Sequence, residues 1–87
     1  MSSYCQAPNV DLKRFYDDGV ATRGSDGTIF AFNAVTIRVW DLLATPLEPE
    51  QIVEALLKEF AVEPEQCQRE LAALLKQMVD ERIVIQT

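Results

Sequence analysis

The chain offers few side chains with which to build a catalytic or metal-binding site. Its 87 residues include no histidine and two widely separated cysteines, Cys5 and Cys67. Zinc sites draw mainly on clustered Cys and His ligands, and the usual activation of a serine or cysteine nucleophile requires an imidazole. We therefore expect no metal site, and we interpret Cys67 as a small buried residue on a helix.

The fourteen acidic residues are the remaining candidates for chemistry. They lie in the first turns of expected helices and on polar helix faces. Nothing there indicates the burial or like-charge pairing that shifts the pKa of a catalytic carboxyl group. The sequence also lacks a Gly-rich phosphate loop and a nucleophile elbow. We predict that the protein is not an enzyme and that it uses no cofactor.

The chain is acidic, with a formal net charge of −6 at pH 7 and a pI of about 4.4. Surfaces that bind nucleic acid are basic, so this charge disfavours a nucleic-acid partner. No apolar run reaches the length of a membrane span, and the first residues show no signal-peptide pattern. Two lone cysteines fit a reducing compartment. We expect a cytoplasmic protein that binds neither nucleic acid nor membrane.

The elements that would position a binding site are organised around the stretch GTIFAFNAVTIRVWDLL, from Gly27 to Leu43. Its first half, Thr28 to Phe32, is a β-branched and aromatic run that follows a cluster of turn formers, which predicts a strand. The second half repeats apolar residues with helical spacing from Ala34 to Leu43. Asn33 stands at the junction and is expected to cap the helix. Trp40 is expected in the core.

The residues before this stretch are expected to complete a sheet. Residues 1–9 are polar and are predicted to form a flexible N-terminus, with the folded domain spanning 10–87. Val10 to Tyr16 and Val20 to Arg23 are the first two strand candidates. They are separated from each other and from the third strand by Asp-Asp-Gly and Gly-Ser-Asp-Gly turn signals. Three short strands joined by tight turns indicate an antiparallel meander.

The residues after it are expected to form two more helices, which begin at Pro49 and Pro64. The third helix extends to about Glu81, and an apolar tail follows. The predicted fold class is therefore α+β and winged helix-turn-helix-like, with a three-stranded antiparallel sheet followed by three helices. A DNA-binding role conflicts with the charge of the third helix, in which three bases oppose four acids: Arg69, Lys76, Arg82, Glu65, Glu70, Asp80 and Glu81.

Several segments resemble one family in order and spacing. Asn33 to Leu43 is similar to the LN-x-x-A-x-x-I-W-x-x-L segment of PqqD-like proteins. Ile52–Leu56 and Phe60–Glu65 are similar to that family's I-V-x-x-L-x-x-x-Y-x-V-x-P-E pattern, and Leu74–Met78 is similar to its F-L-x-x-L. The resemblance covers roughly Val20 to Val84. Each motif is mostly a core pattern, so the resemblance depends on their combined order.

The resemblance implies a function. PqqD-like proteins are recognition elements for ribosomally synthesised, post-translationally modified peptides (RiPPs). They bind the leader peptide of a precursor and act as a peptide chaperone for a modifying enzyme, such as a radical SAM enzyme, a cyclase or a leader protease. In that family the leader adds as a strand beside the third strand, and the last helix forms the other wall of the groove.

The physics of an edge strand supports the same role, because its unpaired N–H and C=O groups can bond an added peptide strand. By period two, Phe30 and Phe32 are assigned to the core and Ile29 and Ala31 to the groove. Leu75 and Val79 on the third helix could equally be core residues and not part of the groove. The predicted peptide-binding residues are Thr28, Ile29, Phe30, Ala31, Gln68, Ala72, Leu75 and Val79.

A second class of function stays open, namely a generic winged-helix-like interaction or regulatory domain that does not bind leader peptides. The neighbouring genes would distinguish the two, since a short precursor gene beside a gene for a modifying enzyme supports leader recognition. Edge strands also permit strand-swapped dimers, so the predicted state is a monomer or such a dimer.

Overall fold

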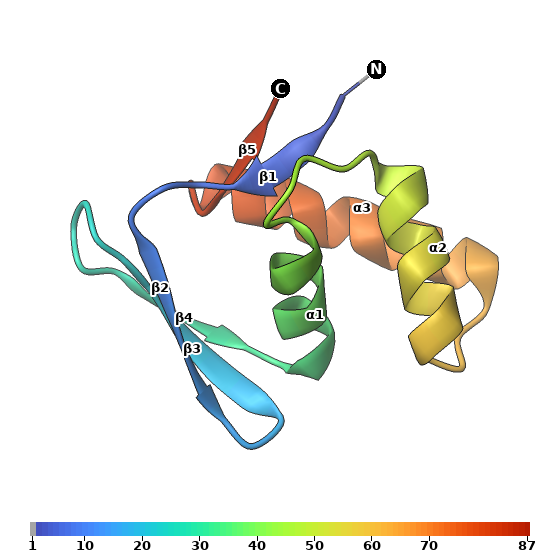
Figure 1. The fold of residues 1–87 in the computed structure, drawn as a ribbon, viewed down its shortest axis with the longest axis horizontal. Helices are drawn as coiled ribbons and strands as arrows, with labels where there is room; N and C mark the ends of the chain where they lie inside the picture. Colours follow the sequence, from blue (N-terminus) through green and yellow to red (C-terminus); the bar gives the residue numbers. More distant parts are fainter. Residues whose placement is uncertain (1) are drawn as a thin grey trace.

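The computed structural model describes residues 2–87, and Met1 lies outside the described residues. The chain forms a three-stranded antiparallel sheet, three helices and a small second sheet (Figure 1). The elements are β1 (Tyr4–Gln6), β2 (Val10–Phe15), β3 (Asp18–Arg23), β4 (Ile29–Phe32), α1 (Ala34–Leu42), α2 (Pro49–Glu59), α3 (Pro64–Asp80) and β5 (Val84–Gln86). The predicted α+β class, with the sheet before the helices, is confirmed.

The three-stranded sheet has the order β2-β3-β4, as expected of a meander. The turn between β2 and β3 is tighter than expected: Tyr16 adopts a left-handed conformation (φ 59°), and Asp18 and Gly19 belong to β3.

Gly19 is buried against α1. A Cβ atom at this position would lie 3.1 Å from Ile37 Cδ1 and 3.0 Å from Leu12 Cδ1. A glycine thus allows α1 to approach the sheet closely.

The first turns of α1 and α2 are capped as the sequence predicted. The Asn33 side-chain oxygen accepts a hydrogen bond from the Thr36 backbone N–H at 2.9 Å, which caps α1. At the start of α2, Pro49 occupies the first turn, and the backbone N–H of Glu48 donates to Gln51 Oε1 at 2.9 Å. The caps fix where α1 leaves β4 and where α2 begins.

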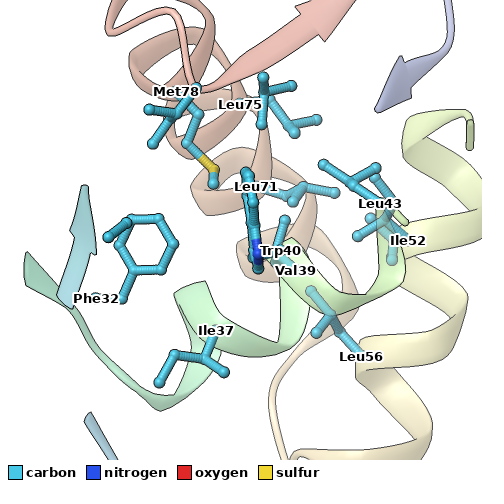
Figure 2. Close-up of a cluster of buried hydrophobic side chains, with 14 of the residues drawn as sticks. Phe32, Ile37, Val39, Trp40, Leu43, Ile52, Leu56, Leu71, Leu75 and Met78 are labelled. Carbon is cyan, nitrogen blue, oxygen red and sulfur yellow. The ribbon is translucent and has the colours of Figure 1, made fainter. Parts of the chain in front are cut away.

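The core lies between the three-stranded sheet and the helices, with α1 in the middle (Figures 1 and 2). Trp40 is 5% exposed, and its ring makes an edge-to-face contact with Phe32 at a centroid distance of 6.1 Å. Leu71 and Met78 supply the α3 side of this cluster. Cys67 is also buried. The predicted burial of Trp40 and Cys67 is confirmed.

The second sheet differs from the expectation that residues 1–9 form a flexible terminus. Tyr4–Gln6 forms β1 and pairs antiparallel with β5, so the apolar tail is also a strand. On its other side, Tyr4 exchanges two backbone hydrogen bonds with Leu47, at 2.8 and 3.0 Å. The sequence did not predict β1, because three residues are too few to show the alternation of apolar and polar residues that identifies a strand. Met1, also within the expected flexible stretch, is outside the described residues.

Candidate peptide-binding site

Strand β4 is an edge of the three-stranded sheet. Within residues 2–87 its strand partner is β3, and its other side pairs with no strand. The register pairs Thr22 with Ile29, and the Arg23 N–H donates to the Thr28 carbonyl oxygen at 2.9 Å. Hydrogen-bonded and non-hydrogen-bonded pairs alternate along an antiparallel ladder. The backbone groups of Phe30 and Phe32 therefore face β3.

The same alternation directs the N–H and C=O groups of Ile29 and Ala31 to the open edge. Ile29 is 67% exposed, and Ala31 is exposed as well. Two outward N–H donors and two outward C=O acceptors are what an added strand needs for main-chain pairing. The edge can thus accept a peptide in an extended conformation.

The two faces of β4 have different surroundings. Phe32 is buried, and Phe30 is half-buried beneath the Arg23 guanidinium, 5.3 Å from its ring centroid. These two side chains face the helices, as predicted. The side chains of Ile29 and Ala31 lie on the opposite, open face of the sheet. The expectation that they point into a groove with α3 is therefore not met, because α3 lies on the Phe30 side. Ile29 and Ala31 offer their backbone to an edge ligand.

A cavity of about 260 Å³ lies beyond the C-terminal end of β4. It begins at Asn33, the residue that follows β4, and continues between the start of α1, the α2–α3 connection and α3. Most of the lining is apolar, and the α3 wall is formed by Cys67, Glu70, Leu71 and Leu74. A side chain of a peptide that extends past Phe32 on the helix side would have this cavity ahead of it.

The predicted α3 wall lies on the other flank of the helix. Gln68, Ala72 and Leu75 line a separate cavity of about 410 Å³ together with Tyr4 of β1 and the start of α2. Val79 lines a third cavity, of about 220 Å³, with Tyr4 and Gln86. Leu75 is 2% exposed and belongs to the core, the alternative that the sequence left open.

The structure therefore does not bring the predicted α3 residues together with β4. The buried ridge of α3 carries Leu71, Leu75 and Met78. A helix advances about 100° per residue, so Leu74 and Ala72 fall on opposite sides of this ridge. The residues predicted from the sequence lie on the Ala72 flank, whereas Glu70 and Leu74 on the other flank line the cavity beside Asn33. The spacing gave no signal for the choice, because both flanks carry some apolar residues.

The turn that leads into β4 is fixed by a cluster around Arg23. Its guanidinium donates to both Asp26 carboxylate oxygens, at 3.0 and 2.6 Å, and to Thr28 Oγ1 at 3.1 Å. The Thr28 backbone N–H donates to Asp26 Oδ1 at 3.1 Å. These bonds hold the pKa of Asp26 well below its usual value, and the bond from Arg23 has the larger effect and that from Thr28 the smaller. The start of the edge strand is thereby held in place.

The cavity beside Asn33 is lined by one thiol, that of Cys67. Burial raises the pKa of the Cys67 thiol, with a further contribution from the charge of Glu70, so the cavity does not favour a thiolate. Among residues 2–87, no three His, Cys, Asp or Glu side chains gather so as to hold a metal ion. In the same part of the chain, no helix has the length and apolar character needed to cross a membrane.

Together, these features define a winged helix-turn-helix-like α+β domain with an open strand edge and an apolar cavity at its end. The chain belongs to the PqqD family, because the family model "Coenzyme PQQ synthesis protein D (PqqD)" matches residues 12–84, most of its length. A search of curated proteins finds no significant match.

Two solved structures are similar to the chain. One is "TbiB1 in Complex with the TbiA(beta) Leader Peptide", at 28% identity and a TM-score of 0.81, covering 92% of this chain and 93% of that one. The other is "Lasso peptide synthetase B1 complexed with the leader peptide", at 18% identity and a TM-score of 0.79, covering 94% and 96%. The second, at this low identity, supports the fold alone.

Proposed function

We propose that the protein is a leader-peptide recognition module of RiPP biosynthesis. It binds the leader of a precursor peptide by strand addition at β4. The observation that carries this proposal is the open edge, where Ile29 and Ala31 turn their N–H and C=O groups outward. Membership of the PqqD family and the likeness to TbiB1, whose structure contains a leader peptide, support it.

In this proposal the binding residues on β4 are Thr28, Ile29, Phe30 and Ala31. Ile29 and Ala31 contribute main-chain bonds, and Phe30 contributes its partly exposed ring. The wall on α3 is the flank with Glu70 and Leu74, in place of the flank with Ala72, because it lines a cavity together with Asn33, the residue that follows β4. Main-chain pairing supplies affinity, and the cavity selects a side chain of the leader.

The protein is proposed to bind and not to catalyse, and to present the precursor to a separate modifying enzyme such as a radical SAM enzyme, a cyclase or a leader protease. We place it in the cytoplasm, a reducing compartment in which Cys5 and Cys67 would stay free thiols. It acts there as a monomer or as a strand-swapped dimer.

The test is a titration of the isotope-labelled protein with the leader of the precursor encoded beside its gene, followed by NMR. Amide shifts are expected to concentrate on residues 28–33 and on the Glu70 flank of α3. The leader alone should bind as tightly as the full precursor, and the core peptide alone should not bind. Shifts confined to the flank with Gln68 and Ala72 would contradict the site, and binding that depends on the core would contradict leader recognition.

A further inference from the structure

The cavity beside Asn33, at the end of β4, is lined by one charged residue, the exposed Glu70. Its carboxylate accepts a hydrogen bond from Gln66 Nε2 at 3.0 Å, a neutral partner one turn earlier on α3. Across the part of the chain that the structure describes, none of the ion pairs includes Glu70. The cavity thus combines an apolar lining with a carboxylate that has no cation beside it.

The opposite end of β4 differs, because its carboxylate has two cations beside it. There the Asp26 carboxylate pairs with Arg23 at 2.6 Å and approaches the Arg82 guanidinium at 4.0 Å. A peptide lying along the edge would therefore meet a carboxylate paired with cations near Thr28 and a carboxylate without a paired cation near Asn33. The net charge of −6 adds a long-range attraction for a cationic peptide.

A bound peptide would change the surroundings of Glu70. An apolar side chain that fills the cavity displaces water from beside the carboxylate and so strengthens its interaction with any neighbouring charge. A positive charge on the peptide then gains affinity, and a negative charge loses it. Side chains on one face of an extended peptide recur every second residue. The favourable cation is therefore two positions from the apolar residue that enters the cavity.

We propose that Glu70 is a specificity-determining residue that selects peptides with a Lys or Arg two positions from an apolar anchor. This inference rests on the proposed leader recognition, and it adds the chemical class of the leader. The anchor occupies the cavity lined by Val39, Leu71 and Leu74, and the cation meets the Glu70 carboxylate at its rim.

The test selects displayed random-sequence peptides against the full-length protein and three variants. Glu70→Gln removes the charge and keeps the shape, and Glu70→Lys reverses it. Glu65→Gln is the matched control, because Glu65 is exposed on the same helix outside the cavity and its loss changes the net charge equally. The wild type and the control are expected to enrich Lys or Arg at a fixed offset from an apolar residue. Glu70→Gln should lose that enrichment, and Glu70→Lys should replace it with Asp or Glu.

A selected basic peptide should bind Glu70→Gln about two- to fivefold more weakly than the wild type at low salt, in the range of an accessible ion pair. The difference should vanish at high salt. A version of the peptide with Gln in place of the base should bind both proteins alike. Equal Lys or Arg enrichment on Glu70→Gln, or none on the wild type, would overturn the charge selection while leaving leader recognition standing. Failure to enrich any peptide on any protein would overturn both.

Discussion

Arg23, at the end of β3, donates a guanidinium hydrogen bond to the backbone carbonyl oxygen of Glu81, which ends α3. The contact ties the sheet that carries the open edge to α3, the helix that lines the cavity beside Asn33. The same guanidinium covers the Phe30 ring and holds Asp26. One side chain thus sets the spacing between β4 and α3.

Replacement of this side chain is expected to loosen that spacing. Arg23→Lys keeps the charge but cannot reach Asp26, Thr28 and Glu81 together, because a lysine has one nitrogen and an arginine has a planar fork. We expect a lower melting temperature and weaker leader binding, measured by thermal denaturation and by peptide titration. The control is Arg69→Lys on the exposed part of α3. Equal melting temperatures for Arg23→Lys and the wild type would contradict the role of Arg23.

Proline substitutions along β4 should differ by position. Ile29→Pro and Ala31→Pro remove N–H groups that face the open edge, so both proteins should fold with nearly unchanged melting temperatures yet fail to bind a leader. Phe30→Pro removes a ladder hydrogen bond to β3 and should cost about 3 kcal/mol of stability or more. Circular dichroism and peptide titration of the three variants measure both properties.

A second substitution at the same place separates the backbone effect from the side-chain effect. Ala31→Val keeps the N–H group and lies on the open face of the sheet, so it should retain binding. Normal binding by a folded Ala31→Pro protein would show that the peptide does not pair with β4. A large loss of stability in all three proline variants would show that β4 is not an edge.

The close approach of α1 to the sheet should make Gly19 intolerant of a side chain. A methyl group there would lie 3.1 Å from both Ile37 Cδ1 and the Lys13 carbonyl oxygen, and the latter cannot move aside easily. Gly19→Ala is expected to cost about 1–3 kcal/mol, the usual range for overpacking. Urea denaturation measures the loss. Ile37→Val, which removes the Cδ1 atom, should recover part of it in the double variant. A Gly19→Ala protein as stable as the wild type would contradict this close packing.

The ion pair at the start of β4 predicts a pH dependence. An unfolded Asp titrates near pH 4, and the bonds from Arg23 and Thr28 lower the pKa of Asp26 in the folded state. The folded state therefore binds fewer protons in this range. The contribution of Asp26 to stability is complete above about pH 5 and is lost as the pH falls toward the lowered pKa.

Asp26→Asn provides the comparison for this pH dependence. The variant should be less stable than the wild type near pH 6, and the difference should shrink on acidification. Chemical denaturation at a series of pH values measures both curves. A difference that stays constant down to about pH 3 would show that Asp26 acts through something other than its ionisation.

Much of the fold could be read from local patterns. The strand from Thr28, the Asn33 cap and the proline starts of α2 and α3 each follow from a few neighbouring residues, and the structure agrees with them to within a residue or two. The pairing of Tyr4–Gln6 with β5 could not be read in this way, because it joins opposite ends of the sequence through backbone bonds. Local pattern contains no information about such a pair.

The candidate site likewise has features that the local sequence predicts and features that depend on tertiary packing. The alternation on β4 predicted that Phe30 and Phe32 face inward, but it could not say on which face of the sheet α3 lies. The choice between Ala72 and Leu74 on α3 depended on the rotation of that helix about its axis. That rotation is set by packing of Leu71 and Met78 against α1 and the sheet, which is a tertiary property. A binding-site wall made of two distant elements therefore needs the structure.

The pairing of β1 with β5 places Ser3 and Thr87 within hydrogen-bond distance, since the Thr87 N–H donates to the Ser3 carbonyl oxygen at 2.8 Å. Residues 3 and 87 can therefore be joined by a short linker without stretching the fold. A backbone-cyclised or circularly permuted variant should keep the native β4 edge, because the junction lies in the other sheet. Cyclisation would also restrict the unfolded chain and raise stability. The fold thus allows the chain to be closed into a ring at a site remote from β4.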